Sequence, residues 1–177
     1  MSLRGDSGLK YISYYDSPVG KLYLTADGKG LTGIAYEHED GNTFPMNIRD
    51  VKFSDNLPVI IDTKLWLELY FSGNNPGFMP KLSIHDSPFR EQVWKVLKTI
   101  PYGQSMSYGE VASIVAKQRK TKASPQAVGG ALAHNPIAII LPCHRVLGAD
   151  GGITGYNGGI EVKKYLLDLE KINYIEK

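Results

Sequence analysis

The sequence contains very little cysteine: among its 177 residues there is one, Cys143. A single thiol excludes a disulfide within the chain and any metal site built from several cysteine ligands. We therefore expect no metal. The sulfur atom either fills space in the core, as buried free cysteines commonly do, or it is a reactive group.

Long apolar runs are also missing. No stretch approaches the roughly 20 apolar residues that cross a membrane, and no internal repeat or low-complexity segment occurs. Residues 1–8 are polar and lack the apolar core of a secretion signal. We expect a soluble, cytoplasmic protein without a membrane partner, in a reducing compartment that keeps a thiol free.

The chain has little excess of either charge, because 20 Lys and Arg against 18 Asp and Glu leave a net charge of +2. The distribution is uneven: residues 1–80 carry 7 basic and 10 acidic side chains (−3), residues 81–150 carry 9 and 4 (+5), and residues 151–177 carry 4 and 4 (0). Lys117, Arg119, Lys120 and Lys122 form the densest basic cluster. Such a cluster suits phosphate binding, although a solvated loop would have the same composition.

The first 80 residues have an α+β pattern. Short β-rich runs at 11–15, 19–25 and 31–36, separated by Pro, Gly and Asp turns, predict a small antiparallel meander. Residues 38–56 give no clear prediction. Apolar spacing over 57–71 predicts a helix, and the Gly- and Asn-rich stretch after it has the composition of a connector. We place a boundary here and expect two domains, 1–80 and 81–177.

The second domain is predicted to be mainly helical. Ser87, Ser107 and Ser124 each stand at the start of a helical pattern, and Glu110 completes a capping box with Ser107. The helices starting at Ser107 and Ser124, joined by the basic turn, predict a helix-turn-helix. The helix that ends at Ala133 is rich in Gly and Ala, so its surface allows the close approach of a nucleic-acid groove or of another helix.

Cys143 follows the apolar run 137–141, which we predict to be an extended strand, and precedes two ionisable residues, His144 and Arg145. These neighbours would pack poorly in an apolar core, which favours a nucleophile. His144 is a candidate base for the thiol, and Glu170, at the end of a helix predicted over 160–170, could reach inward and orient it. The Cys–His pair alone would equally fit a thiol hydrolase or a redox sensor.

The stretch 148–159 is dense in glycine and lies close in sequence to the thiol. Such a loop can bring backbone donors and acceptors against a flat ligand. It lacks the lysine-terminated phosphate-loop pattern, so no nucleotide triphosphate site is predicted.

The longer pattern resembles the O6-alkylguanine-DNA alkyltransferases, or methylated-DNA–protein-cysteine methyltransferases. Its residues are Asn135-Pro136, the run from Pro142 to Val146, and Gly155, Tyr156, Gly158, Gly159, Lys163 and Glu170. The resemblance is strong from about 87 to 170 and weaker over 1–80. It implies an α+β fold, with a small ribonuclease-H-like antiparallel sheet and helix followed by a mainly helical domain containing a helix-turn-helix.

The resemblance implies direct DNA repair: a monomer binds double-stranded DNA containing O6-alkylguanine, flips the base out of the stack, and accepts the alkyl (methyl) group irreversibly on Cys143, once and without a cofactor. Three alternatives stay open at this point. They are an alkyltransferase-like protein that binds the lesion without transferring the group, an ordinary helix-turn-helix regulator, and a cysteine hydrolase.

The resemblance also implies roles for individual residues. Cys143 is the alkyl acceptor, His144 is the base that activates it, and Glu170 is the acid that orients His144. Asn135 braces the turn around Cys143, and Tyr108 donates its hydroxyl proton to the leaving guanine. Arg145 is expected to pair within the domain. The implied base-binding residues are Val146, Tyr156 and Asn157, and the implied DNA-binding residues are Lys120, Lys122, Ser124, Gln126, Ala127, Gly129 and Gly130.

Gln126 departs from the family pattern, because many members carry an arginine at this position. Glutamine can intercalate and form hydrogen bonds, but it lacks the charge and the guanidinium plane. We therefore expect weaker base flipping or weaker DNA affinity at this position.

Overall fold

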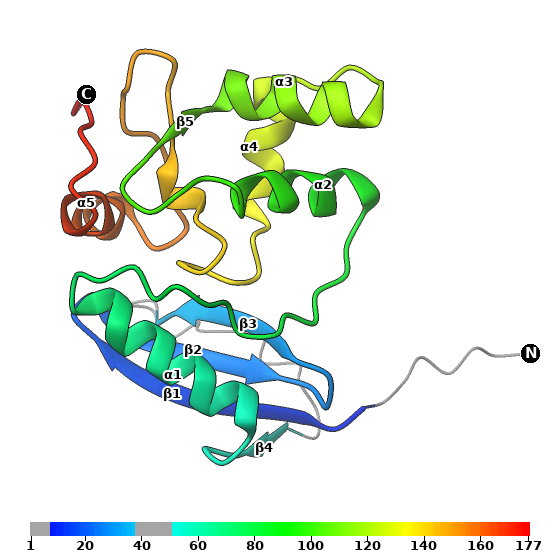
Figure 1. Ribbon diagram of the computed structural model, residues 1–177, viewed down its shortest axis with the longest axis vertical. Helices are drawn as coiled ribbons and strands as arrows, with labels where there is room; N and C mark the ends of the chain where they lie inside the picture. The colour runs from blue at the N-terminus through cyan, green and yellow to red at the C-terminus, as the bar shows by residue number, and fades with distance from the viewer. Residues whose placement is uncertain (1–7, 38–50) are drawn as a thin grey trace, which may run out of the picture. The chain divides into compact units, whose positions relative to one another are not determined.

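The structure, a computed structural model, describes residues 8–37 and 51–177. The chain divides into two compact units, residues 1–84 and 85–177. Most of the stretch that gave no clear prediction, 38–56, lies outside the described residues. The first unit combines a sheet with a helix and the second is mainly helical, so the chain has the expected α+β fold (Figure 1).

The first unit contains a four-stranded sheet in the order β3-β2-β1-β4. β1 (Lys10–Ser17), β2 (Gly20–Ala26) and β3 (Leu31–Tyr36) pair in antiparallel fashion, which confirms the predicted meander. β4 (Val51–Phe53) was not predicted and pairs parallel to β1. A strand of three residues is too short to show an alternating pattern, which explains why β4 was not predicted.

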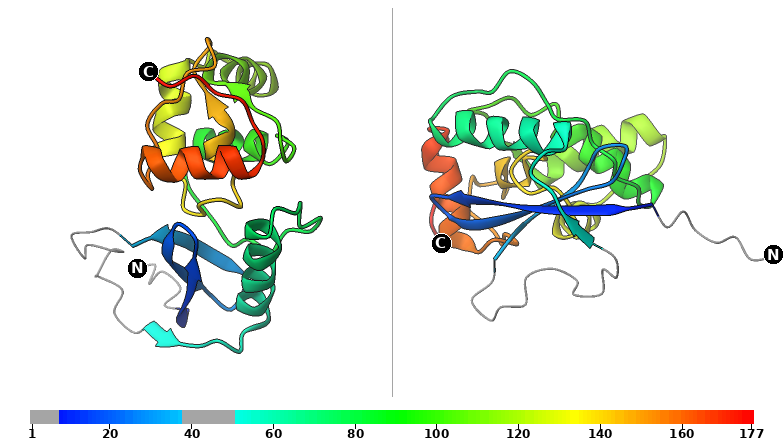
Figure 2. Two further views of the ribbon diagram at one scale, coloured as in Figure 1. Left: turned by 90° about the vertical axis from the view of Figure 1, so that its left-hand side faces the viewer. Right: turned by 90° about the horizontal axis from the view of Figure 1, so that it is seen from below.

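One face of this sheet is covered by α1 (Pro58–Phe71), as Figures 1 and 2 show. The helix was predicted over 57–71 and is confirmed. Leu22 and Leu24 of β2 are completely buried, and so are Ile60 and Leu67 of α1. These side chains form the core of the unit, since alternate residues of a strand point to the same face.

The second unit is mainly helical. Its helices are α2 (Pro88–Leu97), α3 (Tyr108–Arg119), α4 (Pro125–Ala133) and α5 (Ile160–Leu169). Two short strands, β5 (Met106–Ser107) and β6 (Val146–Leu147), pair in parallel, and Cys143–Arg145 form a 3₁₀ turn, η1. All four predicted helices are thus confirmed, whereas β5 and β6 were not predicted.

Three of these helices begin where the sequence predicted, because a serine caps each one. The hydroxyls of Ser87, Ser107 and Ser124 each accept a backbone N–H from the residue three positions later. At Ser107 the Glu110 carboxylate also accepts the Ser107 N–H, which completes the predicted capping box. Such caps stabilise a helix by about 1 kcal/mol each, so the sequence marks the helix starts locally.

α3 and α4 form the predicted helix-turn-helix. Lys120 ends α3 in a left-handed conformation with φ 55°, and the chain turns before Ser124. Val111 and Val115 of α3 and Val128 of α4 are completely buried. The Trp94 indole of α2 also donates a hydrogen bond to the Ala131 carbonyl of α4 at 3.0 Å. Packing against α2 therefore fixes the two helices.

The apolar run 137–141 is not the predicted strand, because it folds into a turn. The Ile140 amide donates to the Ala138 carbonyl at 2.8 Å and the Leu141 amide donates to the Ile137 carbonyl at 3.1 Å. Ile139 has a φ of 71°. These backbone groups bond locally, so they do not form a strand ladder. A buried turn and a buried strand are both apolar, so hydrophobicity alone could not distinguish them.

Candidate active site

Cys143 is the first residue of η1, and its side chain is almost buried, with 7% of the residue exposed. The Asn135 side chain organises the turn that leads to it. Asn135 Oδ1 accepts the Ile137 amide at 2.9 Å, while Nδ2 donates to the Leu141 carbonyl at 2.8 Å and to Cys143 Sγ at 3.2 Å. One amide side chain thus closes the turn and contacts the sulfur atom.

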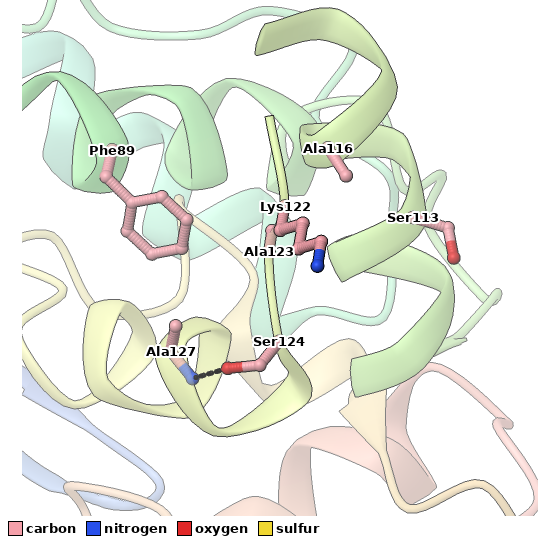
Figure 3. Close-up of a pocket in the computed structure, with 7 residues that line it drawn as sticks. All are labelled: Phe89, Ser113, Ala116, Lys122, Ala123, Ser124 and Ala127. Atoms are coloured by element: carbon pink, nitrogen blue, oxygen red, sulfur yellow. Dashed lines mark hydrogen bonds between the residues drawn. The ribbon is translucent and has the colours of Figure 1, made fainter. Parts of the chain in front are cut away.

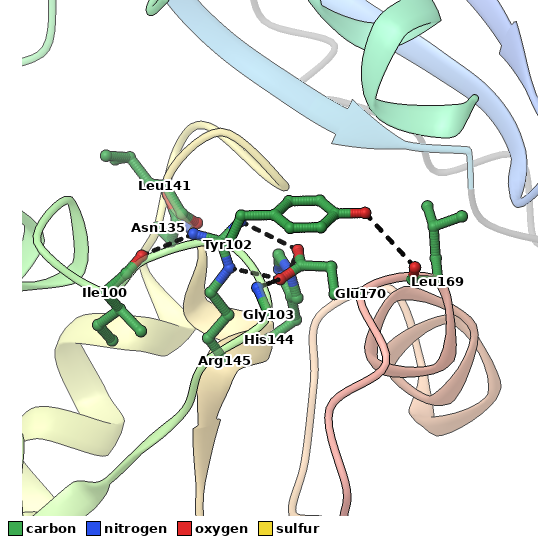
Figure 4. Close-up of polar contacts among 9 residues, drawn as sticks. All are labelled: Ile100, Tyr102, Gly103, Asn135, Leu141, His144, Arg145, Leu169 and Glu170. Carbon is green, nitrogen blue, oxygen red and sulfur yellow. Dashed lines mark hydrogen bonds and ion pairs between the residues drawn. The ribbon is translucent and has the colours of Figure 1, made fainter. Parts of the chain in front are cut away.

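The neighbouring residues His144 and Arg145 both reach Glu170 at the end of α5 (Figure 4). His144 Nε2 lies 2.7 Å from Glu170 Oε1. Arg145 donates from Nε to Oε2 at 2.8 Å and from Nη2 to Oε1 at 3.0 Å, and its Nη1 donates to the Ile100 carbonyl at 2.7 Å. The expected pairing of Arg145 within the domain is confirmed.

Gly103 adds a further donor to Glu170, because its amide bonds to Oε2 at 3.1 Å. Its φ of 79° lies in the left-handed region that glycine adopts without strain. The Glu170 side chain is fully buried. A buried carboxylate must be paired and hydrogen-bonded, and this one is both.

The charge states follow from these contacts. Burial alone would raise the pKa of Glu170, but the hydrogen bonds and charges of His144 and Arg145 outweigh it and lower the pKa to about 2. An ionised carboxylate only accepts, so His144 Nε2 carries a proton. Burial lowers the pKa of His144 below its usual value. His144 is therefore neutral, and Nδ1 is the ring nitrogen with the basic lone pair.

Burial raises the pKa of the Cys143 thiol above its ordinary value, while the Asn135 hydrogen bond and the charge of Lys163 oppose this effect. The resting group is therefore a thiol, not a thiolate. A thiol is a weak nucleophile, so reaction requires a base that removes its proton.

Lys163 is a buried cation for which the sequence analysis proposed no role. It is completely buried on α5, and its Nζ donates to the Val146 carbonyl at 2.9 Å. Burial lowers its pKa to about 8. The signal was present in the sequence, because a lysine on the apolar face of a predicted helix needs an explanation.

Tyr108 reaches this region because β5 pairs with β6. Met106 lies opposite Val146 and Ser107 opposite Leu147, so the start of α3 is held beside the residues that follow η1. The Tyr108 hydroxyl lies 2.6 Å from Thr154 Oγ1 in the glycine-rich loop. Burial raises the pKa of Tyr108, the hydrogen bond with Thr154 opposes this, and the nearby Cys143 adds to the rise. The phenol therefore stays protonated.

The glycine-rich loop 148–159 is also attached to α4. The Asn157 side chain donates to the carbonyl of Ala133, the last residue of α4, at 2.9 Å. Tyr156 is half-buried and Val146 is completely buried. The Asn157 side chain thus joins the loop to the end of α4.

The residues proposed to bind DNA lie mostly on one exposed surface of α4 and the turn before it. Val128, Ala131 and Leu132 face the core, and Gly129 is half-buried. The exposed members of the set are Lys120, Lys122, Ser124, Gln126, Ala127 and Gly130. The surface of α4 thus carries almost no bulky side chain, which allows close approach of another molecule.

A pocket of about 700 Å³ lies beside this surface (Figure 3). It opens between α2, α3 and the start of α4. The lining residues are Phe89, Ser113, Ala116, Lys122, Ala123, Ser124 and Ala127. None of them belongs to the hydrogen-bonded group around Cys143, so this pocket is not the site of the thiol.

Within the part of the chain that the structure describes, no three His, Cys, Asp or Glu side chains are grouped so that they could hold a metal ion. Among the same residues, no helix is both long and apolar enough to span a membrane.

Comparison with protein families gives two matches. Residues 10–84 match the ribonuclease-like domain of 6-O-methylguanine DNA methyltransferase, and residues 88–172 match the DNA-binding domain of the same family. The two matches together cover most of the chain.

Curated relatives agree. The methylated-DNA–protein-cysteine methyltransferase of Haemophilus influenzae is 40% identical over 168 residues, which cover 94% of this chain and 89% of that protein. The protein of the same name from Methanosarcina acetivorans is 36% identical over 160 residues, which cover 90% and 97%.

Solved structures are similar as well. A crystal structure of Mycobacterium tuberculosis OGT in complex with DNA has a TM-score of 0.78 at 38% identity, and the match covers 91% of this chain and 92% of that chain. O6-methylguanine-DNA methyltransferase from Pyrococcus kodakaraensis has a TM-score of 0.62 at 28% identity, with 93% and 100% covered. The protein described here therefore belongs to the methylated-DNA–protein-cysteine methyltransferase family.

Proposed function

We propose that this protein repairs DNA directly, by moving the alkyl group of an O6-alkylguanine in duplex DNA onto Cys143. The observation that carries the proposal is the buried, hydrogen-bonded group in which Cys143 is followed by His144 and His144 bonds to Glu170. The family membership, together with the DNA-bound relative, supports DNA as the partner.

The reaction begins with a proton transfer. His144 Nδ1 takes the thiol proton of Cys143, either directly or through an intervening water molecule. The imidazolium that forms is stabilised by the Glu170 carboxylate 2.7 Å from its other nitrogen. Arg145 keeps this carboxylate ionised, so a positive charge on His144 is tolerated in a buried position.

The thiolate then attacks the alkyl carbon in line with the bond to O6. A carbon–sulfur bond forms, the carbon–oxygen bond breaks, and the electron pair stays on guanine. Tyr108 donates its proton to the guanine ring as this charge develops, and the proton that His144 took from Cys143 then returns to the phenolate through solvent. The products are guanine and a thioether at Cys143. Because a thioether is a poor leaving group, each protein molecule reacts once.

A base within the duplex keeps its O6 substituent stacked and out of reach, so the nucleotide must leave the stack. We assign this step to the exposed surface of α4, whose glycines and alanines fit a minor groove. Gln126 takes the place of the extruded base, and Lys120 and Lys122 bind phosphates. The Val146 carbonyl and the segment of Tyr156 and Asn157 contact the flipped base.

Asn135 has a positioning part in this proposal, because its amide fixes the turn in front of the sulfur atom. A working free thiol also needs a reducing compartment, so the proposal places the protein in the cytoplasm.

The experiment that tests this function is an end-point titration. The protein is incubated with increasing excess of a duplex that contains O6-methylguanine, and restored guanine is measured in the DNA. We expect a plateau at one guanine per protein molecule. Continued turnover would indicate a hydrolase, and bound DNA without any restored guanine would indicate a protein that only recognises the lesion.

A further inference from the structure

Thr154 has no part in the mechanism above, yet its hydroxyl makes the hydrogen bond to Tyr108, at 2.6 Å. The segment that carries it is held in place. Ile153, the preceding residue, is almost buried in a cluster with Leu147 and Leu167, and its amide donates to the Ile175 carbonyl at 2.9 Å. Thr154 therefore presents its hydroxyl from an anchored segment of the loop.

Tyr108 is fixed just as firmly from the other side. It is the first residue of α3 and lies within the capping box that Ser107 and Glu110 form. Its ring also lies against α4, since a Cβ atom at Gly129 would be 4.0 Å from Tyr108 Cε1. With both backbones held, the bond between the two hydroxyls determines where the phenolic oxygen and its proton point.

Only one of the two hydroxyl protons can lie along this bond. If Tyr108 donates, its single proton points at Thr154 and is not available to a base. If Thr154 donates, the Tyr108 proton is free to point elsewhere. The second arrangement is the one that a proton donor to guanine requires.

We propose that Thr154 is a positioning residue: its hydroxyl donates to the Tyr108 oxygen and so directs the Tyr108 proton toward the ring nitrogen of the departing guanine. This inference rests on the proposed function. Thr154 does not touch the substrate and acts only through Tyr108.

Two physical effects make the bond useful. A hydroxyl that accepts one hydrogen bond becomes a stronger donor in the next, by about 10–30% per bond. A donor that already points at the site where charge develops needs no reorientation during the reaction. Burial raises the pKa of Tyr108, and although the Thr154 hydrogen bond opposes this, the pKa stays above its ordinary value, so the proton is present when it is needed.

The test uses four variants of the full chain: Thr154→Val, Thr154→Ser, Tyr108→Phe and the double variant Thr154→Val/Tyr108→Phe. Valine has nearly the shape of threonine and removes only the hydroxyl, while serine keeps it. The second-order rate constant of methyl transfer from an O6-methylguanine duplex is measured for each. Affinity for an undamaged duplex and the midpoint of thermal unfolding serve as controls.

We expect Thr154→Val to react about tenfold more slowly, less than the loss of a direct donor, which lowers rates about 10²–10³-fold. Thr154→Ser should react like the unchanged protein. The double variant should be no slower than Tyr108→Phe, because Thr154 has no effect without the phenol.

The inference is overturned if Thr154→Val reacts at the unchanged rate, if serine fails to restore the rate, or if valine slows the reaction equally in the Tyr108→Phe protein. A failure of the proposed function is distinguishable, because the unchanged protein would then transfer no methyl group at all.

Discussion

Arg145 holds both carboxylate oxygens of Glu170, from Nε at 2.8 Å and from Nη2 at 3.0 Å. His144 lies against the same carboxylate, 2.7 Å from Oε1. Each of the three side chains is buried, so the group works as one unit.

Glu170→Gln should destabilise the fold by about 3–5 kcal/mol near pH 7, because it leaves the Arg145 cation buried without its counter-ion. The loss should shrink in acid. The pKa of Glu170 is lowered from 4.5 to about 2, so its stabilisation is complete above pH 4.5 and disappears as pH falls toward 2; the gap corresponds to about 3 kcal/mol. Urea unfolding of both proteins at several pH values measures the difference.

A matched control is Glu161→Gln, whose side chain is 87% exposed and pairs with Lys164 at the surface. This change should alter stability by less than about 0.5 kcal/mol. A Glu170→Gln protein as stable as this control at pH 7 would contradict the account of the buried pair.

Asn135→Ala should lower both stability and the rate of methyl transfer. The change leaves the Ile137 amide without its partner, and an unsatisfied buried group costs about 1–3 kcal/mol, while the Leu141 carbonyl loses one of its two donors and keeps the Cys143 amide. Asn135→Asp is the informative comparison, since it keeps an acceptor for Ile137 but has no N–H for Leu141 or Cys143. Chemical denaturation should rank the Asp variant between the unchanged protein and the Ala variant in stability. Single-turnover experiments should show slower methyl transfer in both variants, and an unchanged rate in both would contradict the bracing role.

Lys163→Met should change how stability depends on alkaline pH. The pKa of Lys163 is lowered from 10.5 to about 8, so between these values the unfolded chain binds a proton that the folded chain has released. The contribution of Lys163 to stability should therefore rise with pH across this window, by about 3 kcal/mol in total.

Denaturation of Lys163→Met and its parent, both in a Cys143→Ala background that removes the thiol titration, measures this effect. The parent should gain stability relative to the variant between pH 8 and 10. A constant difference over this range would show that the Lys163 ammonium is not destabilised by its burial.

Gln126→Arg should bind duplex DNA more tightly than the unchanged protein. Gln126 is exposed near the start of α4, and an added guanidinium contributes one more phosphate or base contact, so the slope of log affinity against log salt should steepen by about 1. Fluorescence anisotropy with a labelled duplex measures both. Gln104→Arg is the control, because it adds the same charge at an exposed position outside α4. This change should leave the slope unchanged. Equal effects of the two changes would count against α4 as the DNA surface.

Much of the second unit could be predicted because its signals are local. Ser87, Ser107 and Ser124 cap helices through bonds to residues three positions away, so the sequence alone contains both partners. The same holds for the turns of the β1–β3 meander. The joint presence of Cys143, His144 and Glu170 in one group was also foreseen, through the family pattern.

What the sequence did not reveal depends on contacts between distant residues. The run 137–141 turns because the Asn135 amide binds both of its ends, and hydrophobicity carries no trace of such bonds. The pairing of β5 with β6 joins residues about 40 positions apart, a separation that local patterns cannot report. Thr154 was missed for the same reason, since its partner Tyr108 lies 46 positions away in the chain.

The most direct test of the account is peptide mass spectrometry of the protein after reaction with a duplex that contains O6-methylguanine. The account predicts one methyl group per molecule, located on Cys143, and no methylated peptide from Cys143→Ala under the same conditions. A methyl group on any other residue, or restored guanine from the Cys143→Ala protein, would contradict it.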